Sequence, residues 1–289
     1  MKQISLEELL EAGCHFGHQV TRGNPKARDF VFEARDNIQI IDLTKTKEGL
    51  DTAANFAKIL GQKGGSLLVV GTKRQAKPII DEEVTRIKDL LKTDKPDSID
   101  KLLCITQRWV GGILTNFGEV SKNFKRLEDL NEKLANPELQ QGYTKKEIGL
   151  WEKEKQKLEL FYSGISKMQQ KPDALFIIDS HLENLAVREA QATGVPTIAI
   201  VDTNADPYVI DYPIPANDDA VGSIKLIASH ILDAWAEGIK AQKVEKTEEE
   251  KTQPKKEKTE KTQEKVQDEK EEKKAEPKKP VKTKAAKKK

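Results

Sequence analysis

Residues 67–80 read LLVVGTKRQAKPII, and this stretch decides the fold class. Leu67–Val70 is an unbroken apolar run closed by Gly71, and the apolar side chains of residues 79–91 then recur at helical spacing. A strand that is apolar at every position is typical of parallel sheets, in which both faces are covered. The stretch therefore predicts a buried strand that leads directly into a helix, which is the repeating unit of α/β proteins.

The same alternation extends to both sides of this stretch. Further strands are predicted at Ile38–Asp42, Leu102–Thr106, Ala174–Asp179 and Thr197–Asp202. Helices are predicted at about residues 44–60, 79–91, 182–192 and 218–238. Strands that alternate with helices imply right-handed βαβ units, so the expected fold is α/β with a doubly wound parallel sheet.

Residues 117–169 depart from this alternation, because no strand pattern appears between Glu119 and Met168. Apolar residues spaced by four and three predict one helix, and a capping box at Thr144–Glu147 opens a second whose apolar residues recur every seven positions. We expect an antiparallel coiled-coil hairpin inserted in the α/β domain, with Glu154 interrupting its apolar stripe. The alternative is a helical flap packed on the sheet.

The composition divides the chain near residue 242. Residues 243–289 hold 18 of the chain's 50 Lys and Arg residues and 12 of its 48 acidic residues, but none of its aromatic residues. Such a segment cannot bury enough apolar surface to offset its chain entropy, so a disordered tail is expected. Residues 1–242 are expected to form the α/β domain, interrupted by the hairpin, and their acidic excess means that any nucleic-acid contact depends on local basic patches.

The sequence excludes several classes of protein. No apolar run approaches the roughly 18 residues of a membrane span, and the first residues do not resemble a signal peptide. Cys14 and Cys104 are too few for a disulfide framework or a cysteine-rich zinc module, so we expect a soluble protein from a reducing compartment.

Acidic residues follow several of the predicted strands. A carboxylate cluster of Asp179, Asp202 and Asp206 could hold Mg²⁺ for phosphoryl chemistry, because ligands of open α/β sheets bind at the carboxyl ends of the strands. The sequence offers neither a nucleophile beside a histidine base nor a glycine-rich phosphate loop. Aspartates at these positions also cap helices and turns, and we favour that interpretation. The acids concerned are Asp42, Asp179, Asp202, Asp206, Asp218 and Asp219.

Three further segments are candidates for binding. Lys73 and Arg74 open a helix after the best strand and could bind a phosphate. Cys14, His15 and His18 could hold a metal, but ordinary packing is the favoured interpretation. Arg108–Asn116, read RWVGGILTN, either stacks Trp109 on nucleic acid beside a phosphate contact from Arg108, or is a hinge packed by Trp109.

Taken together, these segments resemble the bacterial form of ribosomal small-subunit protein two. The resemblance covers about residues 4–238 and is carried, in the order of that family, by residues 12–19, 24–26, 71–74, 108–116 and 172–219. The sequence departs from the family pattern at Gly23, Ala27 and Thr106-Gln107, and its Lys/Glu-rich tail is an extension that most members lack.

The resemblance implies a flavodoxin-like parallel sheet with a protruding coiled-coil hairpin. It also implies a structural constituent of the small ribosomal subunit that supports translation in the bacterial cytoplasm, without catalysis, cofactor or metal. The implied partners are 16S ribosomal RNA and neighbouring small-subunit proteins, including the large ribosomal protein one where the organism has it. The expected RNA-binding residues are Arg22, Lys26, Lys73, Arg74, Arg108 and Trp109.

Two other functions stay open at this point. One is a Mg²⁺-dependent phosphate-handling enzyme built on the aspartate cluster, and the other is an RNA-binding or regulatory module that acts away from the ribosome. If the leading interpretation holds, replacing Lys73 and Arg74 by glutamate is expected to weaken incorporation into the subunit and to leave folding intact.

Overall fold

The computed structural model describes residues 4–252 of the chain, with side chains as far as residue 242. Five parallel strands form the central sheet in the order β5-β4-β6-β7-β8. The strands are β4 (Leu67–Val70), β5 (Leu102–Ile105), β6 (Ala174–Ile177), β7 (Thr197–Val201) and β8 (Tyr212–Pro215). Numbered along the chain, this order is 2-1-3-4-5, which is the order of flavodoxin-like sheets.

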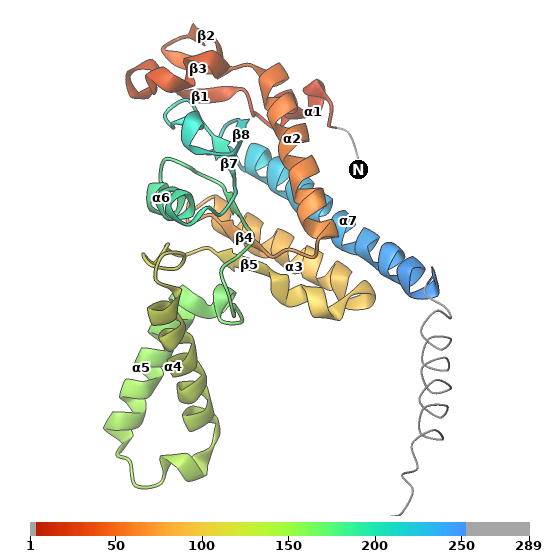
Figure 1. The fold of residues 1–289 in the computed structure, drawn as a ribbon. Helices are drawn as coiled ribbons and strands as arrows, with labels where there is room; N and C mark the ends of the chain where they lie inside the picture. The colour runs from red at the N-terminus through yellow and green to blue at the C-terminus, as the bar shows by residue number, and fades with distance from the viewer. Residues whose placement is uncertain (1–3, 253–289) are drawn as a thin grey trace, which may run out of the picture. The chain divides into compact units, whose positions relative to one another are not determined.

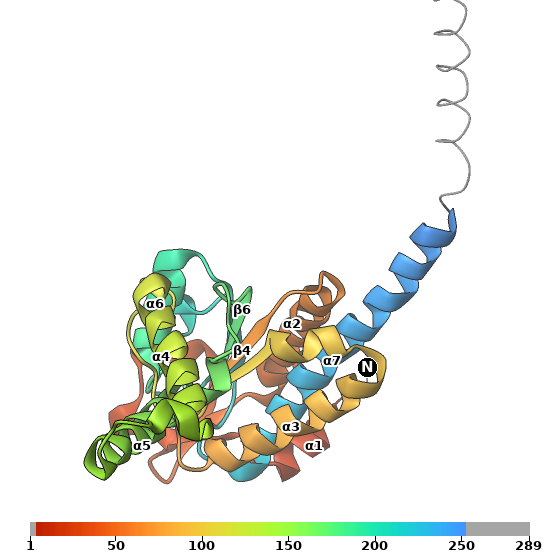
Figure 2. The same ribbon diagram turned by 90° about the horizontal axis from the view of Figure 1, so that it is seen from below.

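Helices cover both faces of the sheet (Figures 1 and 2). On one face a large apolar core joins the sheet to α2 (Leu43–Gln62), α3 (Ala76–Asp94) and α7 (Val221–Thr252). On the other face α6 (Asn184–Thr193) and the base of the helical hairpin pack on the alternate side chains of the same strands. Because both faces are covered, the strands are apolar throughout, as the sequence predicts.

A second, antiparallel sheet lies near the N-terminus, after α1 (Leu6–Glu11). It consists of β1 (Phe16–Gln19), β2 (Val31–Arg35) and β3 (Ile38–Ile41) in the order β1-β3-β2. Asp36 and Asn37 both have positive φ, as a tight two-residue hairpin turn requires. The 3₁₀ turns Val20–Arg22 and Pro25–Phe30 connect β1 to β2.

The sequence placed one strand wrongly and missed another. The predicted strand Ile38–Asp42 is β3, which belongs to the antiparallel sheet and not to the parallel one. The parallel sheet takes β8 as its fifth strand. That strand contains Pro213 and Pro215, and proline is confined to sheet edges because it cannot donate a ladder hydrogen bond.

Two antiparallel helices form a hairpin that extends away from the sheet (Figure 1). They are α4 (Phe117–Ala135) and α5 (Lys145–Tyr162), and α5 opens with the predicted capping box of Thr144 and Glu147. Glu154, which interrupts the apolar stripe, accepts two hydrogen bonds from Arg126 across the hairpin, at 2.8 and 2.9 Å. The second helix ends earlier than predicted, and a 3₁₀ turn at Ser163–Ile165 returns the chain to the core.

Several of the remaining connections contain a 3₁₀ turn. 3₁₀ turns lie at Pro96–Lys101, Pro137–Gln140 and Pro207–Val209. Most of the tail expected to be disordered, residues 253–289, lies outside the described residues. None of the helices in residues 4–252 combines the length and apolar character that crossing a bilayer requires.

Candidate nucleic-acid interface at the carboxyl edge of the sheet

The candidate site lies where the strand order reverses. The chain passes from β4 to β5 on one side and then returns to β6 on the other side of β4. In sheets of this order, ligands bind at the carboxyl ends of the strands at this position. Here Gly71–Arg74 follow β4, and Asp179 lies two residues after the end of β6.

The ammonium group of Lys73 fills this position. Its Nζ lies 2.8 Å from Asp179, 2.7 Å from Asp218 and 2.9 Å from Asp219. Lys73 and Asp179 are largely buried, and the side chain of Asp218 is 1% exposed. Lys73 therefore pairs with three carboxyl groups of the protein itself, and its charge is directed inward.

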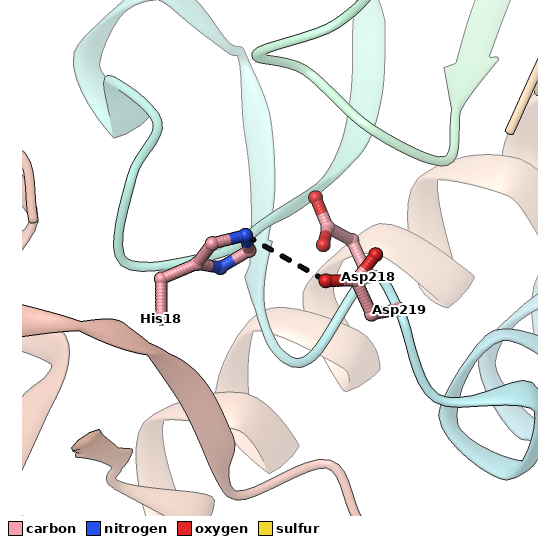
Figure 3. A group of neighbouring side chains, drawn as sticks. All are labelled: His18, Asp218 and Asp219. Atoms are coloured by element: carbon pink, nitrogen blue, oxygen red, sulfur yellow. Dashed lines mark ion pairs between the residues drawn. The ribbon is translucent and has the colours of Figure 1, made fainter. Parts of the chain in front are cut away.

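His18 of β1 completes the same cluster. Its Nδ1 lies 3.1 Å from Asp202 and its Nε2 3.6 Å from Asp219. Figure 3 shows the imidazole of His18 facing the carboxylates of Asp218 and Asp219. One ligand atom from each of these three residues lies within 4.8 Å of the others, so they are the residues that could hold a small cation. This set shares only His18 with the Cys14, His15 and His18 group considered from the sequence.

The crowded, buried acidic side chains of this cluster shift the pKa values of Asp218 and His18. Burial, together with repulsion from Asp179 and Asp202, raises the pKa of Asp218 to about 8, although Lys73 opposes the shift. The hydrogen bond to Asp202 raises the pKa of His18 above its ordinary value against the effect of burial. Protons and the Lys73 ammonium thus both offset the negative charge of this cluster.

Three of the six strand-end aspartates accept capping hydrogen bonds, the interpretation that we favoured from the sequence. Asp42 accepts a hydrogen bond from the amide of Thr44, and Asp206 accepts one from the amide of Tyr208. Asp179 accepts two, from His181 and Leu182. Asp206 pairs with Lys26 instead of joining Asp179 and Asp202. The aspartate trio considered as a Mg²⁺ site is therefore not assembled among the described residues.

Exposed basic side chains surround this edge. Arg74 follows β4, Arg108 follows the neighbouring strand β5, and both are exposed. Their segments are linked, because Lys77 Nζ donates to Gln107 Oε1 at 2.9 Å. Arg22 and Lys26 are also exposed, and their segment is held at the same edge by the amide of Asn24, which donates to the carbonyl of Thr203 at 2.7 Å. Four of the six residues predicted to bind RNA are therefore exposed at one edge.

Trp109 lies in a different environment from these four. Its side chain belongs to the apolar core and is only 5% exposed, so the ring is not presented for stacking on a base. Its Nε1 donates to Oε1 of Glu189 at 3.2 Å. The packing of Trp109 is what the alternative interpretation of this segment predicts.

Sequence reasoning missed Glu189. It lies within a predicted amphipathic helix, where a glutamate is ordinarily solvated. The one signal that could have indicated its burial is that it falls on the apolar face of this helix. Cys14 and His15 were weighed as metal ligands, but Cys14 is buried in the core, where burial raises the pKa of its thiol. The ring of His15 packs against Phe16 with centroids 4.0 Å apart.

One comparison with known proteins bears on this arrangement. The family model described as "Ribosomal protein S2" matches residues 9–238, which is well over half of the chain and includes the whole cluster and the exposed basic residues around it.

Proposed function

The chain belongs to the ribosomal protein S2 family, whose members are structural proteins of the small ribosomal subunit in translation, and on that premise we propose how it binds RNA. Exposed basic side chains at the carboxyl edge of the sheet contact phosphates of 16S ribosomal RNA. These contacts are made by Arg22, Lys26, Arg74 and Arg108. Lys73 and Trp109 hold the segments from which Arg74 and Arg108 extend.

The observation that carries this proposal is the convergence of these four side chains on one edge. They come from three separate segments, residues 22–26, 74 and 108, and each is exposed. Phosphate contacts supply much of the affinity of proteins for nucleic acid, and arginine binds phosphate in a bidentate manner. Because residues 1–242 carry an excess of acid overall, a local basic edge restricts RNA to one face.

The hairpin contacts a neighbour in the subunit under the same proposal. Its distal half extends away from the sheet, and we assign it coiled-coil packing and a role as a contact arm. The neighbours are small-subunit proteins, including the large ribosomal protein one where the organism has it. We also propose the division into an α/β domain of residues 1–242 and a tail of residues 243–289 in the cytoplasmic ribosome.

The test is competition for incorporation. The double variant Arg74→Glu, Arg108→Glu and the tagged wild-type chain are supplied together to small subunits depleted of this protein, and the incorporated ratio is measured. We expect at least ~tenfold less of the variant, because two phosphate contacts become repulsive.

A matched control carries the same change of charge elsewhere. Lys92→Glu with Lys167→Glu changes two exposed lysines, which pair with Asp89 and Asp100 near the opposite edge of the sheet. This control is expected to incorporate nearly as well as wild type. Equal incorporation of the two double variants would show that the carboxyl edge is not the RNA-binding face.

A further inference from the structure

Glu189 binds one loop with an unusual number of hydrogen bonds. Its Oε1 accepts from the indole of Trp109 at 3.2 Å and from the amide of Gly112 at 2.8 Å. Its Oε2 accepts from the amides of Leu114 and Thr115 at 3.1 and 3.3 Å, and from the hydroxyl of Thr115 at 3.1 Å. One carboxylate of α6 thus accepts five hydrogen bonds from a loop 74–80 residues earlier in the chain.

The environment of this carboxylate shows that the hydrogen bonds dominate its energetics. Glu189 is only 6% exposed, and burying a charge is costly unless the charge is paired or hydrogen-bonded. Burial by itself would raise its pKa, but the bonds from Gly112, Trp109, Leu114 and Thr115 outweigh burial and lower the pKa. All five donors belong to neutral groups, so dipoles of the loop stabilise the charge.

The apolar side chains of the bonded loop pack in the core beside the sheet, but its backbone contains a flexible stretch. It contains the adjacent glycines Gly111 and Gly112, and Gly112 has a φ of +96°. Two glycines in succession leave a backbone with a large freedom to lose on folding. Glu189 closes the loop on both sides of this pair, at Trp109 and at Leu114–Thr115. Arg108 is exposed and adjoins Trp109, the first residue held by the carboxylate.

We propose that Glu189 is a positioning residue for RNA recognition, which holds the backbone of residues 109–115 so that Arg108 is presented at the edge of the sheet. This inference rests on the proposed RNA contact of Arg108. Glu189 itself is buried beneath the loop and touches no RNA in this arrangement. Glu189 therefore affects RNA binding indirectly, by ordering this loop.

The experiment is a double-mutant cycle on the full-length chain with Glu189→Gln and Arg108→Ala. Glutamine has nearly the shape of glutamate, but it offers one acceptor oxygen and places an NH₂ group where amides already donate. Affinity is measured for salt-washed small subunits that lack this protein. Glu83→Gln is the matched control, because Glu83 is also buried, at 3% exposure, and it pairs with Arg86 on α3 in the core of the opposite face.

Each single variant at Glu189 or Arg108 is expected to bind about tenfold more weakly than wild type, which corresponds to about 1.4 kcal/mol. In the Arg108→Ala background, Glu189→Gln is expected to have little further effect, because its route to the RNA is already removed. Amide hydrogen exchange of Gly112, Leu114 and Thr115 is expected to accelerate at least ~tenfold in Glu189→Gln, and to stay unchanged in Glu83→Gln.

Other results would overturn the inference in distinguishable ways. If Arg108→Ala binds like wild type, the proposed RNA contact is wrong and the inference falls with it. If Arg108→Ala is weak but Glu189→Gln binds normally, Glu189 does not position the loop for RNA. If the two losses multiply fully in the double variant, or Glu83→Gln weakens binding equally, Glu189 acts through general stability alone.

Discussion

The role of Lys73 is set by the carboxyl groups around it more than by its being a lysine. From the sequence it is a basic residue at a helix start, available to an anion. In the structure its ammonium lies within 2.9 Å of three carboxylates, two of them largely buried. Arg74, the next residue, is exposed. Charge reversal at both positions is expected from the sequence to leave folding intact, but it would place a fourth carboxylate beside these three, so the two residues need separate tests.

We predict that Lys73→Met destabilises the fold by about 3 kcal/mol at pH 7, because removal of one partner leaves buried charge uncompensated. The value is at the low end of the usual range because Asp219 is half exposed and Asp218, with its pKa raised to about 8, is largely protonated at pH 7. Urea denaturation measures the loss. Arg74→Met is the control, and a loss below ~1 kcal/mol for Lys73→Met would contradict the prediction.

The lowered pKa of Glu189 predicts a pH dependence. The native state favours its carboxylate, so its contribution to stability is complete above its ordinary pKa of 4.5 and is lost as the pH falls through the lowered value. The difference in unfolding free energy between wild type and Glu189→Gln is therefore expected to be constant from pH 5 to 7 and to shrink in stronger acid. Urea titrations across this range measure it. A difference that grows toward acid would contradict this sign.

Helices α2 and α7 cross at two glycines, Gly61 and Gly238. A Cβ atom added at Gly61 would lie 2.2 Å from the carbonyl oxygen of Trp235, and one added at Gly238 would lie 2.1 Å from that of Lys58. Trp235 is fully buried and its Nε1 donates to the carbonyl of Gly65 at 3.1 Å. The two backbones are thus in direct contact, and this contact sets how deeply α7 lies in the core.

We predict that Gly61→Ala destabilises the protein by about 2 kcal/mol, because overpacking outweighs the gain in helix propensity. Gly149→Ala on α5 is the matched control. No atom lies within 4 Å of its added Cβ, so the propensity gain remains and the hairpin is stabilised by up to about 1 kcal/mol. Thermal unfolding of both variants provides the measurement. If both substitutions shift the midpoint in the same direction, the glycine contact does not limit the packing.

Sequence periodicity predicts the elements whose pattern of buried residues is regular along the whole element. β4, β6 and β7 are buried at every position and α2 and α3 on one face, so sequence pattern and environment agree. β8 escaped prediction because its two prolines read as a turn, although an edge strand accepts them. The acidic caps were predictable from local bonding. The burial of Lys73 and Glu189 was not, because their partners lie 74 to 146 residues away in the chain.

The two ends of the helical hairpin differ in how far they are buried in the domain. Val120, Phe124 and Tyr162 at the base belong to the core beside the sheet. The distal half contributes little to that core and extends away from it (Figure 1). Folding of the α/β domain therefore depends on the base of the hairpin, and the distal half is free to serve a partner.

We predict that replacing residues 131–149 by a short Gly/Asn turn leaves the thermal midpoint within about 4 °C of wild type. The Arg126–Glu154 pair stays to close the shortened hairpin. Incorporation into small subunits is expected to fall several-fold, because the contact arm has lost its reach. Calorimetry and competition with wild type measure the two effects. Full incorporation of the shortened chain would exclude the arm from the interface.

The contacts that shape the carboxyl edge join distant parts of the chain. The amide of His18 donates to the hydroxyl of Thr203 across 185 residues, and Glu189 holds a loop more than 70 residues before it. During synthesis, which proceeds from the N-terminus, neither contact can form until the region after β6 has left the exit tunnel. A nascent chain that has exposed Arg22, Arg74 and Arg108 still lacks their arrangement. A chain terminated before Glu189 therefore lacks the contacts that arrange this edge.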